Sequence, residues 1–223
     1  MKPKENKKLL HDLVRDRIQR NIDVKQVLLL DANFHESVAN VAMQIVESLR
    51  AGGKVLFFGN GGSAADAQHL AAEFTGRYLK ERRALPALAL NANSSSLTAI
   101  GNDSGFDFVF ARQLEALGKE GDIAIGISTS GNSINVLRAL EAAKKKSMYT
   151  VALTGASGGL TKNVAQCTIC IPSEETPRIQ ECHVLTGHLI CEIVELALFD
   201  DSETGFRHPD FAAVPPHWEA GTK

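Results

Sequence analysis

The fold of this chain is decided by Val55-Leu56-Phe57-Phe58-Gly59-Asn60-Gly61-Gly62-Ser63, an apolar run of strand length that leads into a glycine-rich loop. The run has no polar alternation, which is typical of a strand buried on both faces of a parallel sheet. A glycine-rich loop between such a strand and a helix presents free N–H groups and the positive end of the helix dipole to an anion. The stretch therefore predicts a strand, an anion-binding loop and a helix.

A second stretch repeats this arrangement. The apolar run Ile123-Ala124-Ile125-Gly126-Ile127 is followed by the hydroxyl-rich loop Ser128-Thr129-Ser130-Gly131-Asn132-Ser133. In parallel sheets, ligands collect at the carboxyl ends of the strands, where both loops fall. The two loops together predict a site for a phosphorylated small molecule.

Strand-length apolar runs alternate with helix-like stretches along the rest of the chain. The expected strands are 54–58, 87–90, 122–128, 150–154 and 167–172, and the expected helices are 7–50, 64–74, 107–117, 133–146 and 177–199. Right-handed crossovers between such strands give a doubly wound layer. The prediction is an α/β fold with a doubly wound five-stranded parallel sheet, flavodoxin-like, flanked by helices and preceded by added N-terminal helices.

Composition bears on the class of function. The chain has 223 residues, of which 44% are hydrophobic and 22% charged, with a formal net charge of −2, so it lacks the basic excess that nucleic-acid binding usually needs. The basic start is followed by an apolar stretch that His11 and Asp12 interrupt, which does not fit a signal peptide. No apolar run reaches membrane-spanning length. We expect a cytoplasmic protein with no nucleic-acid partner and no membrane partner.

All four cysteines lie in the last third of the chain, at Cys167, Cys170, Cys182 and Cys191. The first two form a C-x-x-C, which could be a redox pair or half of a zinc site. On a strand, however, residues three apart point to opposite faces, and the chain has no second C-x-x-C. We interpret the cysteines as buried structural thiols, reduced in the cytosol.

Gly59, Gly61 and Ala64 also fit a dinucleotide-binding fingerprint. A dinucleotide-binding site requires an acidic residue at the end of the next strand, about 20 residues further along the chain. The chain has Asn91-Ala92-Asn93 there, and the nearest acid by count, Glu81, falls in the loop before the strand. A dinucleotide site is therefore the weaker interpretation.

Polar side chains recur on two of the expected helices. His69 and Glu73 are four residues apart and share a helix face, a spacing that by itself most often belongs to a solvated surface pair. The last helix carries Gln180, His183 and His188 within an apolar sequence. For either histidine, a buried ring with a backbone partner is the ordinary alternative to a functional role.

Five motifs occur in order between residues 30 and 199. They are Gly59-Asn60-Gly61-Gly62-Ser63, His69-x-x-x-Glu73-x-Thr75-Gly76-Arg77-Tyr78, Gly101-Asn102-Asp103-x-Gly105-Phe106, Ile127-Ser128-Thr129-Ser130-Gly131-Asn132-Ser133, and Arg178-Ile179-Gln180-Glu181-x-His183 with His188. In order and spacing they resemble the phosphoheptose (sedoheptulose 7-phosphate) isomerases of the sugar-isomerase-domain superfamily. The N-terminal extension and the tail lie outside the resemblance. We expect N-terminal helices at 1–53 that pack on the core and form oligomer contacts, a sugar-isomerase domain at 54–199 and a C-terminal tail at 200–223.

The resemblance implies an aldose–ketose isomerase that converts sedoheptulose 7-phosphate to D-glycero-D-manno-heptose 7-phosphate, for bacterial heptose and surface glycans such as lipopolysaccharide. It implies a cytoplasmic homotetramer with active sites at subunit contacts. Glu73 would be the general base and His188 the acid, and a zinc ion in each subunit would be held by His69, Glu73, Gln180 and His188. The implied substrate-binding residues are Asn60, Gly61, Gly62, Glu73, Asn102, Asp103, Ser128, Thr129, Ser130, Ser133 and Gln180.

These residue types suit the reaction. Moving a proton between C1 and C2 through an enediol needs one group for the carbon-bound proton and another for the oxygens, which a carboxylate and an imidazole provide. Zinc would polarise the carbonyl, and Glu73 would then alternate between ligand and base. Gln180 and His188 are eight residues apart, roughly 12 Å of rise on a regular helix. Either Gln180 lies in a frayed first turn, or another subunit supplies part of the site.

Two other functions remain open. Proteins of this fold also act as non-catalytic sugar-phosphate-binding proteins or as partners of the replication initiator, and the acid at His188 favours an enzyme over these. The other rival is an isomerase or regulatory domain for hexose phosphates, because only the motifs argue for seven carbons.

Overall fold

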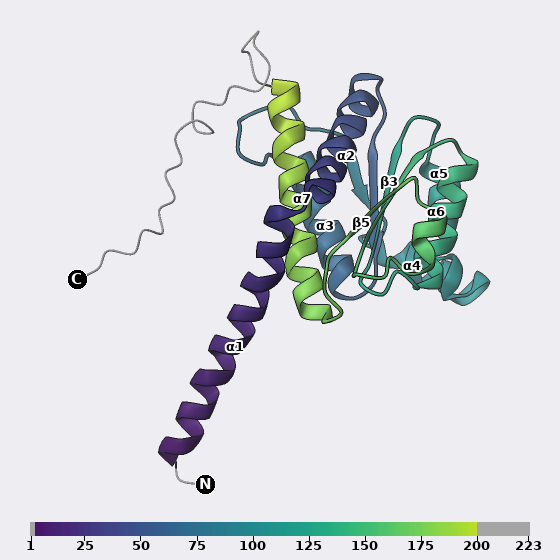
Figure 1. Cartoon of the computed structure of the whole chain (residues 1–223). Coiled ribbons are helices and arrows are strands. Elements are labelled where there is room, and N and C mark those ends of the chain that lie inside the picture. The colour runs from purple at the N-terminus through teal and green to yellow at the C-terminus, as the bar shows by residue number, and fades with distance from the viewer. Residues whose placement is uncertain (1–2, 200–223) are drawn as a thin grey trace.

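A computed structural model describes residues 3–199 of the chain. Its centre is a sheet of five parallel strands in the order β2-β1-β3-β4-β5 (Figure 1). The strands are β1 (Val55–Gly59), β2 (Ala87–Ala89), β3 (Ile123–Ser128), β4 (Tyr149–Thr154) and β5 (Cys167–Cys170). This is the flavodoxin-like doubly wound order, so the predicted fold is confirmed. The expected tail at 200–223 lies outside the described residues.

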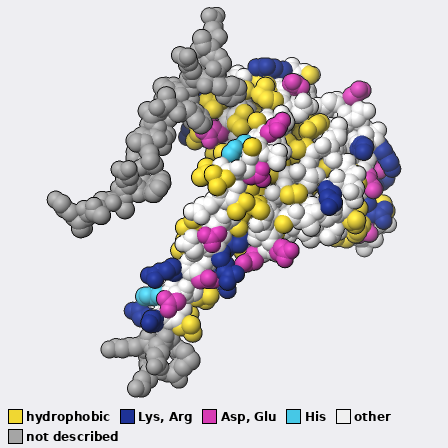
Figure 2. Space-filling view, in the orientation of Figure 1, with side chains coloured by type: hydrophobic (Ala, Val, Ile, Leu, Met, Phe, Trp, Pro, Cys, Tyr) yellow, Lys and Arg dark blue, Asp and Glu magenta, His cyan; other side chains and the backbone are white. Residues whose placement is uncertain are grey.

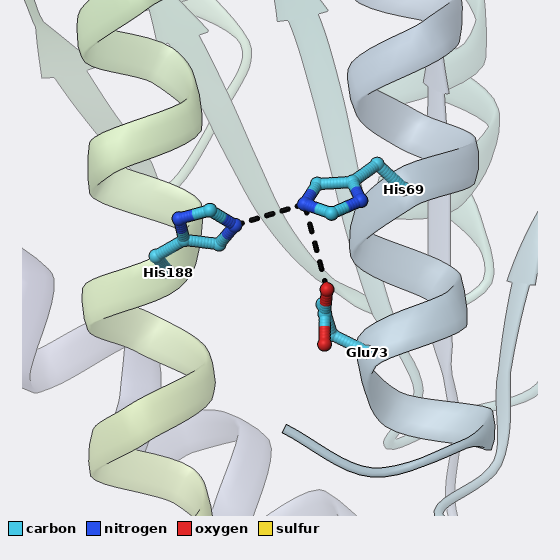
Figure 3. Close-up of side chains that lie close together, drawn as sticks. All are labelled: His69, Glu73 and His188. Carbon is cyan, nitrogen blue, oxygen red and sulfur yellow. Dashed lines mark hydrogen bonds and ion pairs between the residues drawn. The ribbon is translucent and has the colours of Figure 1, made fainter. Parts of the chain in front are cut away.

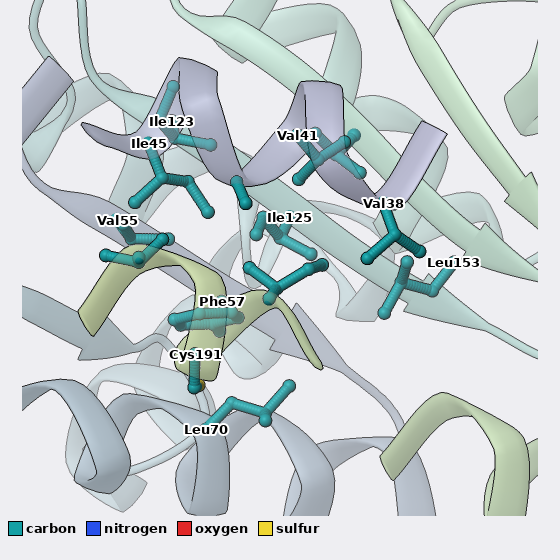
Figure 4. Packing of buried hydrophobic residues seen from close by; sticks show 14 of the residues in the cluster. Val38, Val41, Ile45, Val55, Phe57, Leu70, Ile123, Ile125, Leu153 and Cys191 are labelled. Carbon is teal, nitrogen blue, oxygen red and sulfur yellow. The ribbon is translucent and has the colours of Figure 1, made fainter. Parts of the chain in front are cut away.

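Helices cover both faces of the sheet. One face carries α2 (Ala32–Arg50), α3 (Gly62–Thr75) and α7 (Thr176–Phe199), and the other carries α5 (Ala111–Leu117) and α6 (Ile134–Lys145). Along β1, Val55 and Phe57 point into the first core, whereas Leu56 and Phe58 point into the second. Figure 4 shows the first core, in which side chains from α2, α3 and α7 meet the sheet. Every residue of β1 and β3 is buried, as a parallel sheet covered on both faces requires.

The helix expected over 7–50 is divided into two, α1 (Pro3–Leu30) and α2. The break falls at Asp31, whose carboxylate accepts the N–H groups of Asn33 at 2.9 Å and Phe34 at 3.2 Å. A carboxylate in this position satisfies N–H groups that have no partner within the helix. Because of this break, α1 and α2 need not share one helix axis.

α1 projects from the body of the molecule (Figure 1). Its C-terminal half is tied to the start of α7, where Arg20 pairs with Glu175 at 2.8 Å and the Arg178 guanidinium donates to the carbonyl of Arg17 at 2.8 Å. Large hydrophobic side chains stay exposed along the helix, among them Leu10 (59%). Figure 2 shows hydrophobic atoms between charged ones on this projection.

Helix α4 (Ser94–Ser104) and the short 3₁₀ helices η1 (Phe106–Phe108) and η2 (Leu160–Asn163) were not expected from the sequence. α4 contains no buried residue. Apolar periodicity identifies a helix only when one face is buried, so the pattern contains no signal for α4.

α7 corrects the expectation that no apolar run reaches membrane-spanning length. Within residues 3–199 it is the only helix that is long and apolar enough to span a membrane by length and composition. It has 24 residues, and an 18-residue window of it has a mean hydropathy of 1.5. It packs instead against α2 and α3, and 44% of that window is buried in the fold. The four cysteines are free thiols. Cys182 and Cys191 on α7 are buried, as predicted, whereas on β5 Cys167 is half-buried and Cys170 is exposed. The prediction of a buried thiol is therefore wrong for Cys170.

Candidate active site

The two anion-binding loops lie side by side at the carboxyl end of the sheet. Gly59 at the end of β1 is paired with Ile127 near the end of β3, and the strand order reverses between these two strands. Asn60 of the first loop and Asn135 in the first turn of α6 are then joined by two reciprocal amide hydrogen bonds of 2.9 Å. This is the crevice in which open α/β sheets bind ligands.

The first loop leaves the start of α3 open. Gly61 has φ +56°, a conformation that L side chains rarely adopt, and no side chain caps the helix. A Cβ atom at Gly62 would overlap the Gln180 amide. The Gln180 side chain therefore lies directly over the first turn of α3, beside the exposed N–H groups that suit a phosphate.

The second loop is folded by its own hydroxyl groups. The Ser128 and Ser133 hydroxyls are 3.0 Å apart, and the Asn132 N–H donates to the Ser130 hydroxyl at 3.1 Å. Helix α6 begins here without a side-chain cap. Thr129 and Ser130 line a cavity of about 300 Å³. The loop thus presents hydroxyl groups and an uncapped helix start together.

Three of the four expected metal ligands meet between α3 and α7 (Figure 3). The Nε2 atoms of His69 and His188 are 2.8 Å apart, and His69 Nε2 lies 3.5 Å from a Glu73 carboxylate oxygen. The three ligand atoms all lie within 4.8 Å of one another. His69 is exposed, whereas Glu73 and His188 are half-buried. His69 and Glu73 are therefore more than a solvated surface pair, because a third functional group from α7 joins them.

The cluster forms because α3 and α7 run parallel in close contact. Near the start of both helices, Gly62 of α3 lies next to Gln180 of α7. Further along both helices, His69 of α3 lies next to His188 of α7. The contact is close at Gly187, where a Cβ atom would overlap the Leu70 side chain. A glycine next to His188 thus lets the two helices approach until the histidine rings meet.

Other expected site residues lie away from this cluster. α7 is helical from Thr176 onward, so the explanation by a frayed turn at Gln180 does not hold. Asn102 and Asp103 are exposed on α4 and are hydrogen-bonded to each other at 2.8 Å. In the part of the chain that the structure describes, neither donates to nor accepts from a residue of the cluster or of the two loops.

His183 has the ordinary role of a buried histidine. It is 1% exposed, and its Nε2–H donates to the carbonyl of Thr154 at 3.1 Å. Its Nδ1 is buried without a hydrogen-bond partner among the described residues. Burial lowers the pKa of His183 to about 4, and the hydrogen bond to the Thr154 carbonyl opposes that shift. The ring is therefore neutral at physiological pH.

Sequence reasoning missed two residues beside the cluster. The Tyr78 ring packs against His188 with centroids 5.6 Å apart, and burial raises the pKa of its phenol. Asp66 precedes His69 by three residues, and one of its carboxylate oxygens is buried without a partner among the described residues. Burial raises the pKa of Asp66, and His69 opposes that shift. The three-residue spacing places Asp66 and His69 on one helix face, a signal that the sequence does contain.

Comparison with known proteins identifies first the class and then the family. Residues 25–155 match the family model of the SIS domain, so fold and site define a SIS-domain protein. A phosphoheptose isomerase of Aneurinibacillus thermoaerophilus is 50% identical over 190 residues, which cover 85% of this chain and 96% of the relative. One of Rhodospirillum rubrum is 57% identical over 162 residues, 73% of this chain and 86% of the relative.

A solved structure gives the same result. Phosphoheptose isomerase GmhA from Neisseria gonorrhoeae superposes with a TM-score of 0.79 at 42% identity, covering 83% of this chain and 98% of that one. The chain belongs to the phosphoheptose isomerase family.

Proposed function

We propose that this protein converts sedoheptulose 7-phosphate to D-glycero-D-manno-heptose 7-phosphate, the step that supplies heptose for bacterial surface glycans such as lipopolysaccharide. The observation that carries the proposal is the meeting of Glu73 and His188 across α3 and α7, in a chain whose relatives are phosphoheptose isomerases. A protein that only bound sugar phosphates would need the two loops but not this pair, so the non-catalytic alternative is not favoured.

The chemistry is acid–base catalysis on carbons 1 and 2. Glu73 removes the carbon-bound proton and returns it to the neighbouring carbon, and His188 exchanges protons with the two oxygens, so that an enediol connects ketose and aldose. The Tyr78 ring on His188 limits the directions in which the imidazole can turn. Ser128, Thr129, Ser130 and Ser133, with Asn60, Gly61 and Gly62, hold the phosphate and the adjacent hydroxyl groups.

We propose zinc as the metal of this site. Two imidazole nitrogens and a carboxylate oxygen that converge within 4.8 Å are a ligand set that zinc prefers. His69, Glu73 and His188 would hold the ion, and Gln180 from a second copy would be the further ligand, because the Gln180 side chain of the same copy lies over the first turn of α3. When bound, zinc supplies a Lewis acid that stabilises negative charge on the substrate oxygens.

We further propose that the active enzyme is a homotetramer in the cytoplasm. The expected ligand Gln180 lies over Gly62, which is about 10 Å of helical rise from His69 on α3, and Asn102 and Asp103 are exposed on α4. Both observations support a site that a second copy completes. The exposed hydrophobic side chains along α1, Leu10 among them, support self-association through this helix, because such surface is costly in water.

The experiment is an isomerase assay with sedoheptulose 7-phosphate beside fructose 6-phosphate, with and without a metal chelator. We expect turnover of the seven-carbon sugar only, loss of turnover with the chelator, and recovery when zinc is added back. Metal content measured on the purified protein before and after chelation tests the zinc site apart from activity. Faster turnover of the hexose phosphate would reject the substrate assignment.

A variant separates catalysis from binding. His188→Asn keeps a polar side chain but no acid near neutral pH, so turnover should disappear while the sugar phosphate still raises the melting temperature. His35→Asn, exposed on α2, is the matched control and should keep its turnover. A wild-type protein that binds the sugar and never converts it, even with zinc supplied, would decide for a binding protein.

A further inference from the structure

A buried ion pair lies beside the cluster and has no role in the proposed chemistry. Arg82 Nε donates to the Glu195 carboxylate at 2.7 Å, and the two side chains are 2% and 3% exposed. Arg82 lies in the connection between α3 and β2, and Glu195 lies near the end of α7. Burying two charges costs several kcal/mol per ion before their attraction is counted, and an apolar pair would fill the same space. Stability alone is therefore a weak reason for the pair.

The Arg82 guanidinium ties down the end of α3. It donates to the carbonyl oxygens of Glu73 at 2.7 Å, Phe74 at 3.0 Å and Gly76 at 3.3 Å. The last carbonyls of a helix have no partner within it, and here one side chain satisfies several of them. Glu73 is in this turn, so the guanidinium fixes the backbone that carries the expected base.

The Glu195 carboxylate ties down the loop that follows α3. It accepts the N–H groups of Tyr78 at 3.2 Å, Leu79 at 2.7 Å and Lys80 at 2.8 Å. Burial by itself would raise the pKa of Glu195, but these bonds and Arg82 together hold it below its ordinary value. The carboxylate is thus ionised, and it fixes the backbone of Tyr78.

The two halves of the pair act on the same cluster. His188 and Glu195 are seven residues apart, which is two turns of α7, so they share one face of that helix. Tyr78, held by Glu195, packs on the His188 ring. Glu73, held by Arg82, lies on the other side of the cluster. The ion pair therefore restrains the surroundings of both groups that the reaction needs.

We propose that Arg82 and Glu195 are positioning residues for the isomerisation: together they set the separation of Glu73 from His188 by fixing the end of α3 and the loop that carries Tyr78. The proposal rests on the proposed function, because positioning matters only if those two groups exchange protons with a substrate. Neither residue touches the phosphate loops, which follow β1 and β3. Their loss should affect turnover and not substrate binding.

The test uses Glu195→Gln and Arg82→Lys in the full chain. The amide of Gln keeps the size of Glu195 but turns a donor toward the loop N–H groups, and Lys keeps the charge of Arg82 but cannot reach several carbonyls at once. We expect kcat to fall by about 10-fold or more, because small displacements of reacting groups are costly. KM should stay within about 2-fold of the wild type. Glu81→Gln, in the same loop with a side chain that is 85% exposed, is the matched control.

A second measurement reports on the loop without any turnover. Hydrogen exchange of the backbone N–H groups of Tyr78, Leu79 and Lys80 follows the loop directly, because these groups donate to the Glu195 carboxylate. Release of the loop should speed exchange at all three in both variants. Glu81→Gln should leave their exchange unchanged.

The outcomes separate the proposals. If the wild type has no isomerase activity, the proposed function fails, and hydrogen exchange still tests whether the ion pair holds the loop. If Glu195→Gln and Arg82→Lys speed exchange of the loop N–H groups but keep kcat, the pair orders the loop without positioning catalysis, and the proposal is wrong. Unchanged exchange also overturns it.

A substitution that restores packing covers the case in which these variants unfold. Arg82→Met with Glu195→Leu replaces the pair by apolar side chains, which often recovers stability. Recovery of the unfolding midpoint with kcat still low supports positioning. Recovery of both shows that the pair only stabilises the fold.

Discussion

Replacing His183 should remove a large part of the loss of stability in mild acid. The ring is 1% exposed and its pKa is lowered to about 4 by burial, whereas an unfolded histidine titrates near 6.5. Between these values the unfolded chain binds a proton that the folded chain does not, so stability falls as the pH falls. The contribution is fully present above the unfolded pKa and is lost as the pH falls toward the folded one.

The magnitude follows from the two pKa values. At about pH 5, proton binding to the unfolded state stabilises it by about 2 kcal/mol relative to the folded state, and the limit well below both values is about 3.4 kcal/mol. His183→Gln retains a donor for the Thr154 carbonyl and does not titrate. The variant starts from lower stability at neutral pH if packing is disturbed, but its free energy of unfolding should fall by about 2 kcal/mol less than that of the wild type between about pH 7 and pH 5.

The assay is urea denaturation followed by circular dichroism over this range of pH, at one fixed subunit concentration because association changes the apparent stability. Leu117→Gln is the control, since it places the same amide at an exposed position of α5 and changes no histidine, so its free energy of unfolding should fall with pH as steeply as that of the wild type. Parallel curves for His183→Gln and the wild type would refute the reasoning, because they would mean that the ring is not buried in its neutral form.

Three further outcomes are expected. Gly187→Ala should cost about 1–3 kcal/mol of stability by overpacking and weaken zinc binding, because the added methyl group would overlap Leu70 and separate the histidines; calorimetry and a metal-competition titration measure the two effects, and Leu70→Ala in the same chain should restore part of both. Ser130→Ala should raise KM more than it lowers kcat, because the loss of a hydrogen-bond donor to a phosphate dianion weakens binding by about 1.5–3 kcal/mol. An unchanged KM would remove this loop from the site. Glu73→Gln should lower kcat by about 10²-fold or more while phosphate affinity persists, whereas Glu115→Gln, exposed on α5, should change neither; near-normal turnover of Glu73→Gln would exclude it as the base.

The sheet was predictable because its strands are buried on both faces and are therefore continuous apolar runs. The run expected at 54–58 became β1 (Val55–Gly59), and the one expected at 122–128 became β3 (Ile123–Ser128). Features that depend on single hydrogen bonds or on solvated faces were not predictable in this way. The break at Asp31 rests on one side-chain cap, and α4 has no buried face to produce a periodic pattern.

The site likewise has parts that local sequence spacing predicts and parts that depend on tertiary packing. Local spacing identifies both loops and the helical pair of His69 and Glu73. It does not show that His188 meets them, because this depends on α3 and α7 packing in parallel with Gly187 at the contact. The Arg82–Glu195 pair joins residues that are 113 apart in the sequence, and motifs of local spacing contain no information about such a partner.

The contact between His69 and His188 spans 119 residues, and this has a consequence for the order of events during synthesis. All five strands precede α7 in the chain, so a ribosome has made the whole sheet before His188 exists. Chains fold as they emerge from the N-terminus, and a partly made chain then holds only half of its metal ligands. We expect that neither metal binding nor activity begins until the last helix docks. Metal binding by a chain that ends before Thr176 would contradict this expectation. Synthesis and docking of α7 are thus an early requirement for metal binding, before subunits associate.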